Sequence, residues 1–225
     1  MDKLHRKAFG GLVFLLLVMV VLLFGPAGGL AYWQAWVFLV VYFGLSLAIT
    51  LDLIRHDPQL LARRMSGGPT AEKETTQKII MWIASVGFFA LLIVPSLDHR
   101  FGWSRMPAVI ALAGDALVLL GWYGIFRVFR ENTFSSATIE IAPDQTVIST
   151  GPYARVRHPM YACALAMLAG IPIALGSWWG LAAFVVVIPA LIWRLLDEEQ
   201  FLARNLAGYA EYQSKVRYRL IPNIW

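Results

Sequence analysis

The sequence contains few charged residues and only one cysteine. Of its 225 residues, 15% are charged and 59% are hydrophobic, whereas soluble domains carry about 25% charged and about 45–50% apolar residues. An intrinsically disordered chain is excluded, because such chains are polar and rich in charge. The single Cys163 excludes an intramolecular disulfide framework and a metal site built from several cysteines. The composition indicates an integral membrane protein whose function resides in its polar parts.

The basic residues are not clustered in the way that nucleic-acid binding requires. The net charge is +5, but a nucleic-acid surface needs Lys and Arg gathered on one exposed face, and here they stand between long apolar runs. The histidines are also scattered, at positions 5, 56, 99 and 158. We therefore expect no nucleic-acid partner and no metal, and we expect membrane lipids as the surroundings.

Long apolar runs predict an all-α integral membrane protein with about six transmembrane helices. A spanning helix needs about 20 mostly apolar residues, and in lipid a helix satisfies its own backbone hydrogen bonds. The last two runs are separated only by Gly176 and Ser177, so we expect a tight helical hairpin there. We expect one membrane domain over residues 1–225, with four spans in 1–131 and the functional half in 132–225. The runs are Ala8–Phe24, Ala31–Ile54, Ile79–Leu97, Pro107–Phe129, Pro159–Leu175 and Trp178–Leu196.

The first run has a second interpretation, as a secretory signal peptide. Lys3, Arg6 and Lys7 form a basic segment ahead of it, and Pro26–Gly29 could precede a cleavage site. We expect a retained helix, because five further apolar runs follow it.

The distribution of Lys and Arg predicts the orientation in the membrane. If the N-terminus is cytosolic, all of the 19 Lys and Arg residues except Arg100 and Arg105 fall on or near the cytosolic side. This asymmetry is the one that the positive-inside rule describes. We therefore expect a multi-pass protein with both termini in the cytosol, in a bacterial inner membrane.

The connections on the predicted cytosolic side are long, and loops carry function more often than spans do. Residues 138–141 and 146–148 alternate apolar and polar side chains on either side of a Pro-Asp turn, which predicts a small hairpin or an extended pair. Residues 66–69 form a flexible break, and a helix is expected to begin at Thr70 with Glu72 in its first turn. Pro159 suits the first position of a helix, so His158 is expected at its N-cap.

Arg194 and Glu198 lie four residues apart at the end of the last predicted span and share one helix face. One interpretation is an ordinary intrahelical ion pair. The other is a functional cation at the inner membrane boundary that meets a lipid-dissolved anion, because ionisable groups at such depth are rare and often functional.

A resemblance to a known family rests on one string and the residues that follow it. Gly151–Tyr161 (GPYARVRHPMY), then Glu198–Leu202 (EEQFL) and the pairs Gly208-Tyr209 and Glu211-Tyr212, resembles the isoprenylcysteine carboxyl methyltransferase family. It also resembles the wider membrane methyltransferase group that includes phospholipid N-methyltransferases. The resemblance covers roughly Asn132–Trp225, and the first four spans carry no family signature.

The resemblance implies methyl transfer from S-adenosylmethionine at the cytosolic membrane face. It implies a lipophilic or membrane-partitioned acceptor, most like the carboxylate of a prenylated cysteine, with phospholipid amines and small thiols as alternatives. The spacing between Leu202 and Tyr209 differs from that of the eukaryotic members, and the spans are fewer, so the acceptor is not defined by the resemblance.

The resemblance also implies roles for individual residues in the cofactor-binding half. Arg194 matches the family arginine that meets the acceptor carboxylate, and with Glu198 it forms the implied catalytic pair. A sulfonium cation favours the faces of tyrosine rings and a carboxylate such as Glu198. The implied cofactor-binding residues are Gln145, Thr146, Val147, Ile148, Tyr153, His158, Tyr161 and Glu198.

Other interpretations of the same residues remain open at this point. His158 is also a possible helix cap, and Tyr153 and Tyr161 are possible packing residues at the membrane interface. An enone or sterol reductase using NADPH shares short His-Pro or Pro-x-Tyr elements, but Ala162 stands where an acidic residue is expected after the tyrosine. A small transporter or scaffold is the non-enzymatic alternative.

Overall fold

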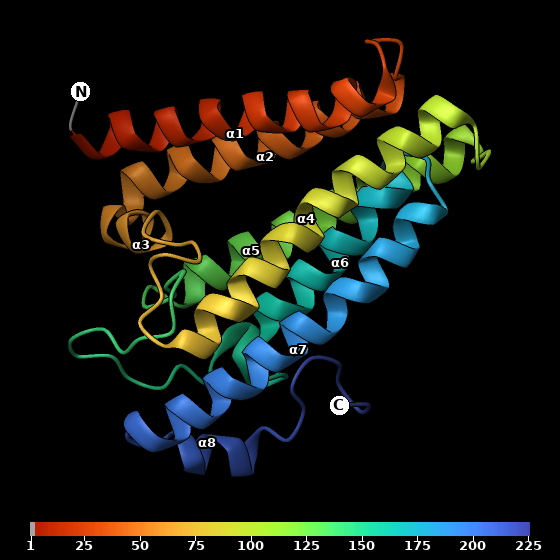
Figure 1. Ribbon diagram of the computed structural model, residues 1–225. Helices are drawn as coiled ribbons and strands as arrows, with labels where there is room; N and C mark the ends of the chain where they lie inside the picture. Colours follow the sequence, from red (N-terminus) through yellow and green to blue (C-terminus); the bar gives the residue numbers. More distant parts are fainter. Residues whose placement is uncertain (1–2) are drawn as a thin grey trace.

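The computed structural model describes residues 3–225, which form an all-α membrane protein, as predicted (Figure 1). Five helices, α1, α2, α4, α5 and α7, are long and apolar enough to cross a membrane. The elements are α1 (Lys3–Ala27), α2 (Trp33–His56), α3 (Pro58–Arg64), α4 (Thr75–Phe101), α5 (Ala108–Glu131), the 3₁₀ turn η1 (Gly151–Ala154), α6 (Pro159–Ala174), α7 (Trp179–Asn205) and α8 (Tyr209–Lys215).

The fifth predicted span is a shorter helix than the others. Helix α6 has 16 residues, fewer than the roughly 20 that cross a bilayer without help. It begins at Pro159, as expected, and turns directly into α7. Gly176 in this turn has a φ of 74°, a backbone conformation that glycine adopts without steric cost. The last two helices thus form the predicted tight hairpin.

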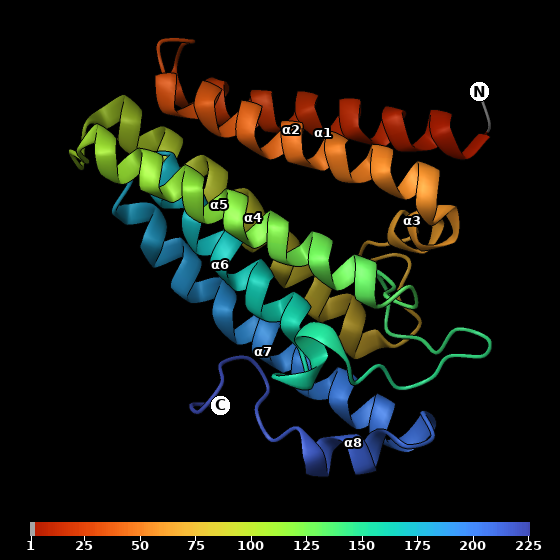
Figure 2. The same ribbon diagram turned by 180° about the vertical axis from the view of Figure 1, so that it is seen from behind.

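The helices alternate in direction, so the long connections gather at one end of the bundle, which we call the loop end (Figures 1 and 2). The loop end carries α3, residues 65–74, residues 132–158 and everything after α7. The opposite end has only short connections. There the ring of Tyr32 stacks on His99 with centroids 4.1 Å apart. The exposed tryptophans at this opposite end resemble an aromatic membrane belt; they are Trp33, Trp36, Trp103, Trp178 and Trp179.

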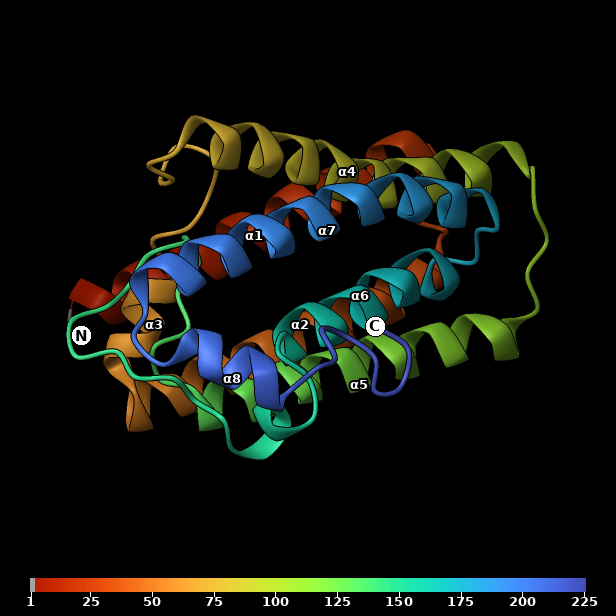
Figure 3. The same cartoon turned by 90° about the horizontal axis from the view of Figure 1, so that it is seen from below.

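Helices α5 and α6 lie side by side, as do α4 and α7 (Figure 3). Glycines allow the close approach of α5 and α6. A Cβ at Gly121 would lie 2.6 Å from the Cβ of Met167 and 2.8 Å from the carbonyl oxygen of Cys163, and a Cβ at Gly170 would lie 2.9 Å from the carbonyl oxygen of Gly114. Small residues at helix interfaces are a usual means of association in membranes. This contact fixes α6, which has His158 at its N-cap and Tyr161 in its first turn.

The connection between α5 and α6 differs from the prediction. The expected hairpin or extended pair within residues 132–158 is wrong, because no strand forms there in the described chain. Backbone groups of this connection bond instead to side chains from other parts of the protein. Arg64 donates to the carbonyl of Ser136, Arg194 donates to the carbonyl of Ala137, and the amide of Ile139 donates to Glu72.

The start of the third predicted span is also different. Helix α4 begins at Thr75 rather than at Thr70, because Glu72 leaves the helical path to bond inside the protein. A short helix that was not predicted, α3, begins where Asp57 accepts a hydrogen bond from the amide of Leu60 at 2.9 Å and Pro58 stands at the first position. Both are ordinary helix-start signals.

Candidate active site

A cavity of about 600 Å³ extends from the loop end into the space between the helices. Its volume lies within the range of about 300–1,000 Å³ that is usual for small-molecule sites. The cavity has a polar part near the loops and an apolar part between the helices. The polar part contains all of the residues that the resemblance singled out: Gln145, Thr146, Val147, Ile148, Tyr153, His158, Tyr161, Arg194 and Glu198. The apolar part includes Leu12, Leu15, Ile49, Leu53, Ile125, Phe129, Met167 and Leu191.

Tyr161 and Glu198, from the adjacent helices α6 and α7, meet at the wall of the cavity. The hydroxyl of Tyr161, in the first turn of α6, donates to Oε2 of Glu198 on α7 at 2.6 Å. The ring of His158 stands edge-on to the ring of Tyr161, with centroids 5.7 Å apart. The site thus places a carboxylate, a phenol and an imidazole along one wall.

The neighbouring Glu199 anchors this wall from behind. Its Oε1 accepts from Nε of Arg157 at 2.7 Å and from Nε2 of His158 at 3.1 Å, and its Oε2 accepts from Nε of Arg219 at 2.8 Å. Because an ionised carboxylate only accepts hydrogen bonds, Nε2 of His158 carries the proton. Although His158 occupies the N-cap position of α6, its side chain makes no capping bond. The predicted N-cap position of His158 is thus confirmed, but its side chain bonds to Glu199 rather than capping the helix.

The sequence interpretation missed Glu199, although it stands next to Glu198. Consecutive residues on a helix point about 100° apart, so the two carboxylates serve different neighbours. The Glu-Glu pair was visible in the sequence, but the sequence does not indicate which glutamate contacts Tyr161 and which contacts His158.

The C-terminal segment, residues 216–225, holds the loop before α6 in place. The amides of Arg157 and His158 donate to the carbonyls of Tyr218 and Arg219, both at 2.9 Å. The hydroxyl of Tyr212 in α8 donates to the carbonyl of Tyr153 at 2.7 Å. The wall that carries His158 is therefore built by three segments that are distant in the chain.

Tyr153 is held by contacts at both its backbone and its ring. Its hydroxyl accepts from Nδ2 of Asn132 at 2.9 Å. Burial raises the pKa of Tyr153, although hydrogen bonds with Asn132 and Ser135 act in the opposite direction. The phenol therefore stays protonated and presents a neutral aromatic surface to the cavity.

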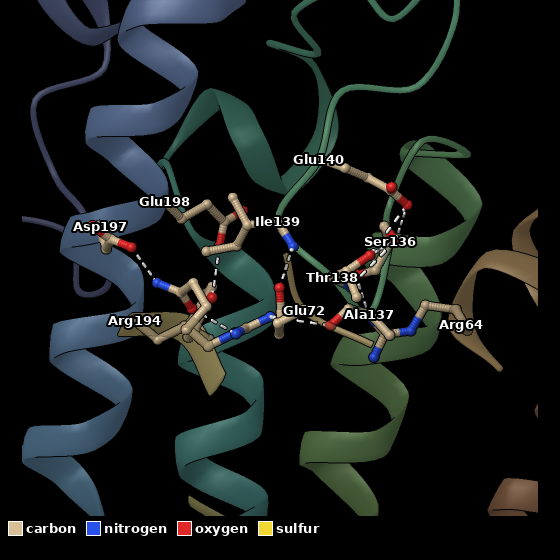
Figure 4. Close-up of polar contacts among 12 residues, drawn as sticks. Arg64, Glu72, Ser136, Ala137, Thr138, Ile139, Glu140, Arg194, Asp197 and Glu198 are labelled. Atoms are coloured by element: carbon tan, nitrogen blue, oxygen red, sulfur yellow. Dashed lines mark hydrogen bonds and ion pairs between the residues drawn. The ribbon is translucent and has the colours of Figure 1, made fainter. Parts of the chain in front are cut away.

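Arg194 does not pair with Glu198, so the intrahelical ion pair is also wrong. Its Nη2 donates to Oε1 of Glu72 at 2.7 Å, and its Nη1 donates to Oε1 of Gln77 at 2.7 Å (Figure 4). Arg194 is 8% exposed and Glu72 is 4% exposed. The carboxylate that neutralises Arg194 thus comes from the segment before α4, 122 residues away in the chain, and no local pattern indicated it.

Part of the chain that forms this site matches a known protein family. Residues 109–208 match the phospholipid methyltransferase family. The match confirms the predicted resemblance to the membrane methyltransferase group. It extends further toward the N-terminus than the resemblance did, because it includes α5, and it ends at Gly208. The matched segment contains His158, Tyr161, Glu198 and Glu199.

Two relatives carry names that refer to metal resistance. A cobalt-zinc-cadmium resistance protein, CzcN, of Cupriavidus metallidurans is 29% identical over 142 residues, which cover 61% of this chain and 61% of that protein. A nickel-cobalt-cadmium resistance protein, NccN, of Alcaligenes xylosoxydans xylosoxydans is 26% identical over 133 residues, which cover 51% of this chain and 61% of that protein. The chain thus spans about three fifths of each relative. Within residues 3–225, no group of three or more His, Cys, Asp or Glu side chains is placed to hold a metal ion.

Proposed function

We propose that this protein is a membrane methyltransferase that uses S-adenosylmethionine and acts on a lipophilic or membrane-partitioned acceptor. The observation that carries the proposal is the convergence of His158, Tyr161 and Glu198 on one cavity that continues into an apolar space between the helices. The family match supports the reaction class. It fits a phospholipid amine and a prenylcysteine carboxylate equally as acceptors.

The residues of the cavity fit S-adenosylmethionine chemically. When bound, this cofactor supplies an electrophilic methyl group on a cationic sulfur. The carboxylate of Glu198 provides a negative charge for that cation, and the rings of Tyr153 and Tyr161 provide faces that attract it. The hydrogen bond from Tyr161 holds the Glu198 carboxylate in one orientation.

The remaining residues position these groups and limit access of water. Glu199 fixes the start of α6, so His158 and Tyr161 hold their places without rearrangement during transfer. The apolar side chains of α1, α2 and α5 exclude water from the inner part of the cavity, which strengthens the electrostatic contacts. Arg194 lies on the acceptor side in this proposal, with its guanidinium held in place by Glu72.

We also propose that the loop end faces the cytosol of a bacterial inner membrane, with both termini on that side. The supporting observation is the position of the basic residues. Arg100 and Arg105 lie at the end away from the loops, whereas the other Lys and Arg residues lie at or near the loop end. That is the asymmetry of the positive-inside rule.

The test is calorimetric binding to the purified protein in dodecyl maltoside. We expect saturable binding of S-adenosylmethionine and of S-adenosylhomocysteine, and none of NADPH. Replacement Glu198→Gln should weaken S-adenosylmethionine more than S-adenosylhomocysteine, because only the former carries the sulfonium charge. The matched control is Glu211→Gln, since Glu211 is exposed and pairs only with Lys215. Absence of binding in several detergents, or binding of NADPH alone, would refute the proposal.

A further inference from the structure

Among the described residues, three arginines line the cavity: Arg64, Arg157 and Arg194. Two of them have a buried carboxylate partner. Arg157 bonds to Glu199 at 2.7 Å, and Arg194 bonds to Glu72 at 2.7 Å. Arg64 has no carboxylate partner within the described part of the chain. Of the three arginines, Arg64 is thus the one that no carboxylate of the described residues meets within hydrogen-bonding distance.

The contacts of Arg64 leave most of its donors unused. Its Nη1 donates to the carbonyl oxygen of Ser136 at 2.6 Å, and its guanidinium lies over the ring of Phe129, 5.2 Å from the centroid. A guanidinium has five N–H donors in a planar fork, and only one of them is used here. The remaining donors can bond to both oxygens of a carboxylate or phosphate group. In Figure 4 the guanidinium of Arg64 lies apart from the Arg194 cluster, beside residues 136–138.

The cost of this arrangement points to a ligand. Burial lowers the pKa of the Arg64 guanidinium and the nearby Arg194 acts in the same direction, whereas Glu198 favours the charged form of Arg64 through space without bonding to it. Arg64 is half-buried, and a charge that loses part of its hydration is ordinarily compensated by a partner. An anion that enters the cavity would supply the missing partner.

The position of Arg64 indicates what kind of anion it meets. Arg64 is the last residue of α3, and Leu61 of the same helix also lines the cavity. On the other side lies Phe129, at the start of the apolar part. An amphiphile with its chain between the helices would place its head group at Arg64. Arg194 is less suited, because Glu72, Gln77 and the carbonyl of Ala137 already occupy its terminal nitrogens.

We propose that Arg64 is the oxyanion-binding residue of the cavity and takes a carboxylate or phosphate group carried by the amphiphilic acceptor. This inference rests on the proposed function, since it assigns part of the acceptor's recognition. A carboxylate also occurs on the amino-acid part of the cofactor, so the experiment separates these two sources.

The experiment compares Arg64→Gln with the matched control Arg63→Gln. Arg63 is the neighbouring residue of α3, has the same charge and bonds to the carbonyl of Thr133, but it does not line the cavity. The probes are dodecanoate, dodecyl phosphate and dodecan-1-ol, which share one chain and differ in the head group. Binding is measured by thermal stabilisation in dodecyl maltoside, whose head group is uncharged.

The wild type and Arg63→Gln should bind the two anionic probes at least tenfold more tightly than the alcohol. Arg64→Gln should lose this preference and keep its affinity for the alcohol. If Arg64→Gln does not fold, Arg64→Met serves instead, because it keeps a long unbranched apolar side chain and removes the unpaired charge. Equal affinity for the three probes in the wild type, or a preference that survives in the Arg64 variants, overturns the proposal.

Cofactor binding by the wild type and Arg64→Gln shows whether the oxyanion at Arg64 belongs to the acceptor or to the cofactor. An unchanged affinity of Arg64→Gln for S-adenosylhomocysteine supports the acceptor as the source. A tenfold loss for S-adenosylhomocysteine, with no loss for methylthioadenosine, which lacks the carboxylate, overturns the acceptor assignment in favour of the cofactor. If the wild type binds no S-adenosylhomocysteine, the proposed function fails, while the amphiphile measurements still decide the role of Arg64.

Discussion

Replacement of Glu199 by glutamine tests whether the buried anchor behind His158 supports the site. The Glu199 side chain is 5% exposed and Arg157 is 8% exposed, so the change leaves a buried guanidinium without its counter-charge. Removing one partner of a buried pair costs about 3–5 kcal/mol. Glutamine keeps one neutral acceptor, so we expect a loss of about 3 kcal/mol. The contact with Arg219, which is 31% exposed, adds less than about 1 kcal/mol.

This loss has two measurable consequences. For a protein of this size, about 3 kcal/mol corresponds to a Tm lower by about 6–12 °C, which thermal unfolding in dodecyl maltoside measures. The second consequence is weaker binding of S-adenosylhomocysteine, by at least tenfold in calorimetry, because His158 and the C-terminal segment lose their common partner. Hydrogen exchange should then show faster opening of residues 216–225.

Two further variants separate the anchoring role from a general loss of stability. Glu211→Gln removes an exposed carboxylate that pairs only with Lys215, and it should change the Tm by less than about 4 °C, since exposed pairs contribute about 0–1 kcal/mol. The double variant Arg157→Met/Glu199→Gln removes the stranded charge, so it should recover part of the Tm without recovering cofactor affinity. A Glu199→Gln protein with the Tm and affinity of the wild type would refute this reasoning.

Two more predictions concern packing and the second buried ion pair. Gly121→Ala should lower the Tm, because the added Cβ would lie 2.6 Å from the Cβ of Met167. Gly44→Ala should not, because no atom lies within 4 Å of the position that its Cβ would occupy. Equal Tm values of the two variants in a thermal scan would contradict this prediction. Glu72→Gln should destabilise the protein by roughly 3 kcal/mol through the stranded Arg194, whereas Glu74→Gln, at an exposed position, should have little effect. Matching unfolding curves for the two glutamate variants would show that Glu72 does not carry the charge of Arg194.

Several features of this protein follow from short stretches of sequence. The long apolar runs predicted the helices that can cross a membrane, because length and hydrophobicity are properties of a single segment. Pro159 predicted the start of α6, because its fixed φ suits the first position of a helix. The string around His158 and the Glu198-Glu199 pair led to the methyltransferase resemblance, and the match over residues 109–208 confirms that resemblance.

Only the tertiary structure decided which charged groups neutralise one another. Glu72 meets Arg194, and Glu199 rather than Glu198 meets His158, because buried charges take the partner that the helix packing brings within reach, however distant it is in the chain. The predicted hairpin is likewise replaced by tertiary contacts, since the side chains of Arg64, Arg194 and Glu72 bond to backbone groups of residues 136, 137 and 139. The one cavity-lining arginine without a carboxylate partner in the described chain, Arg64, became visible only when these pairings were known.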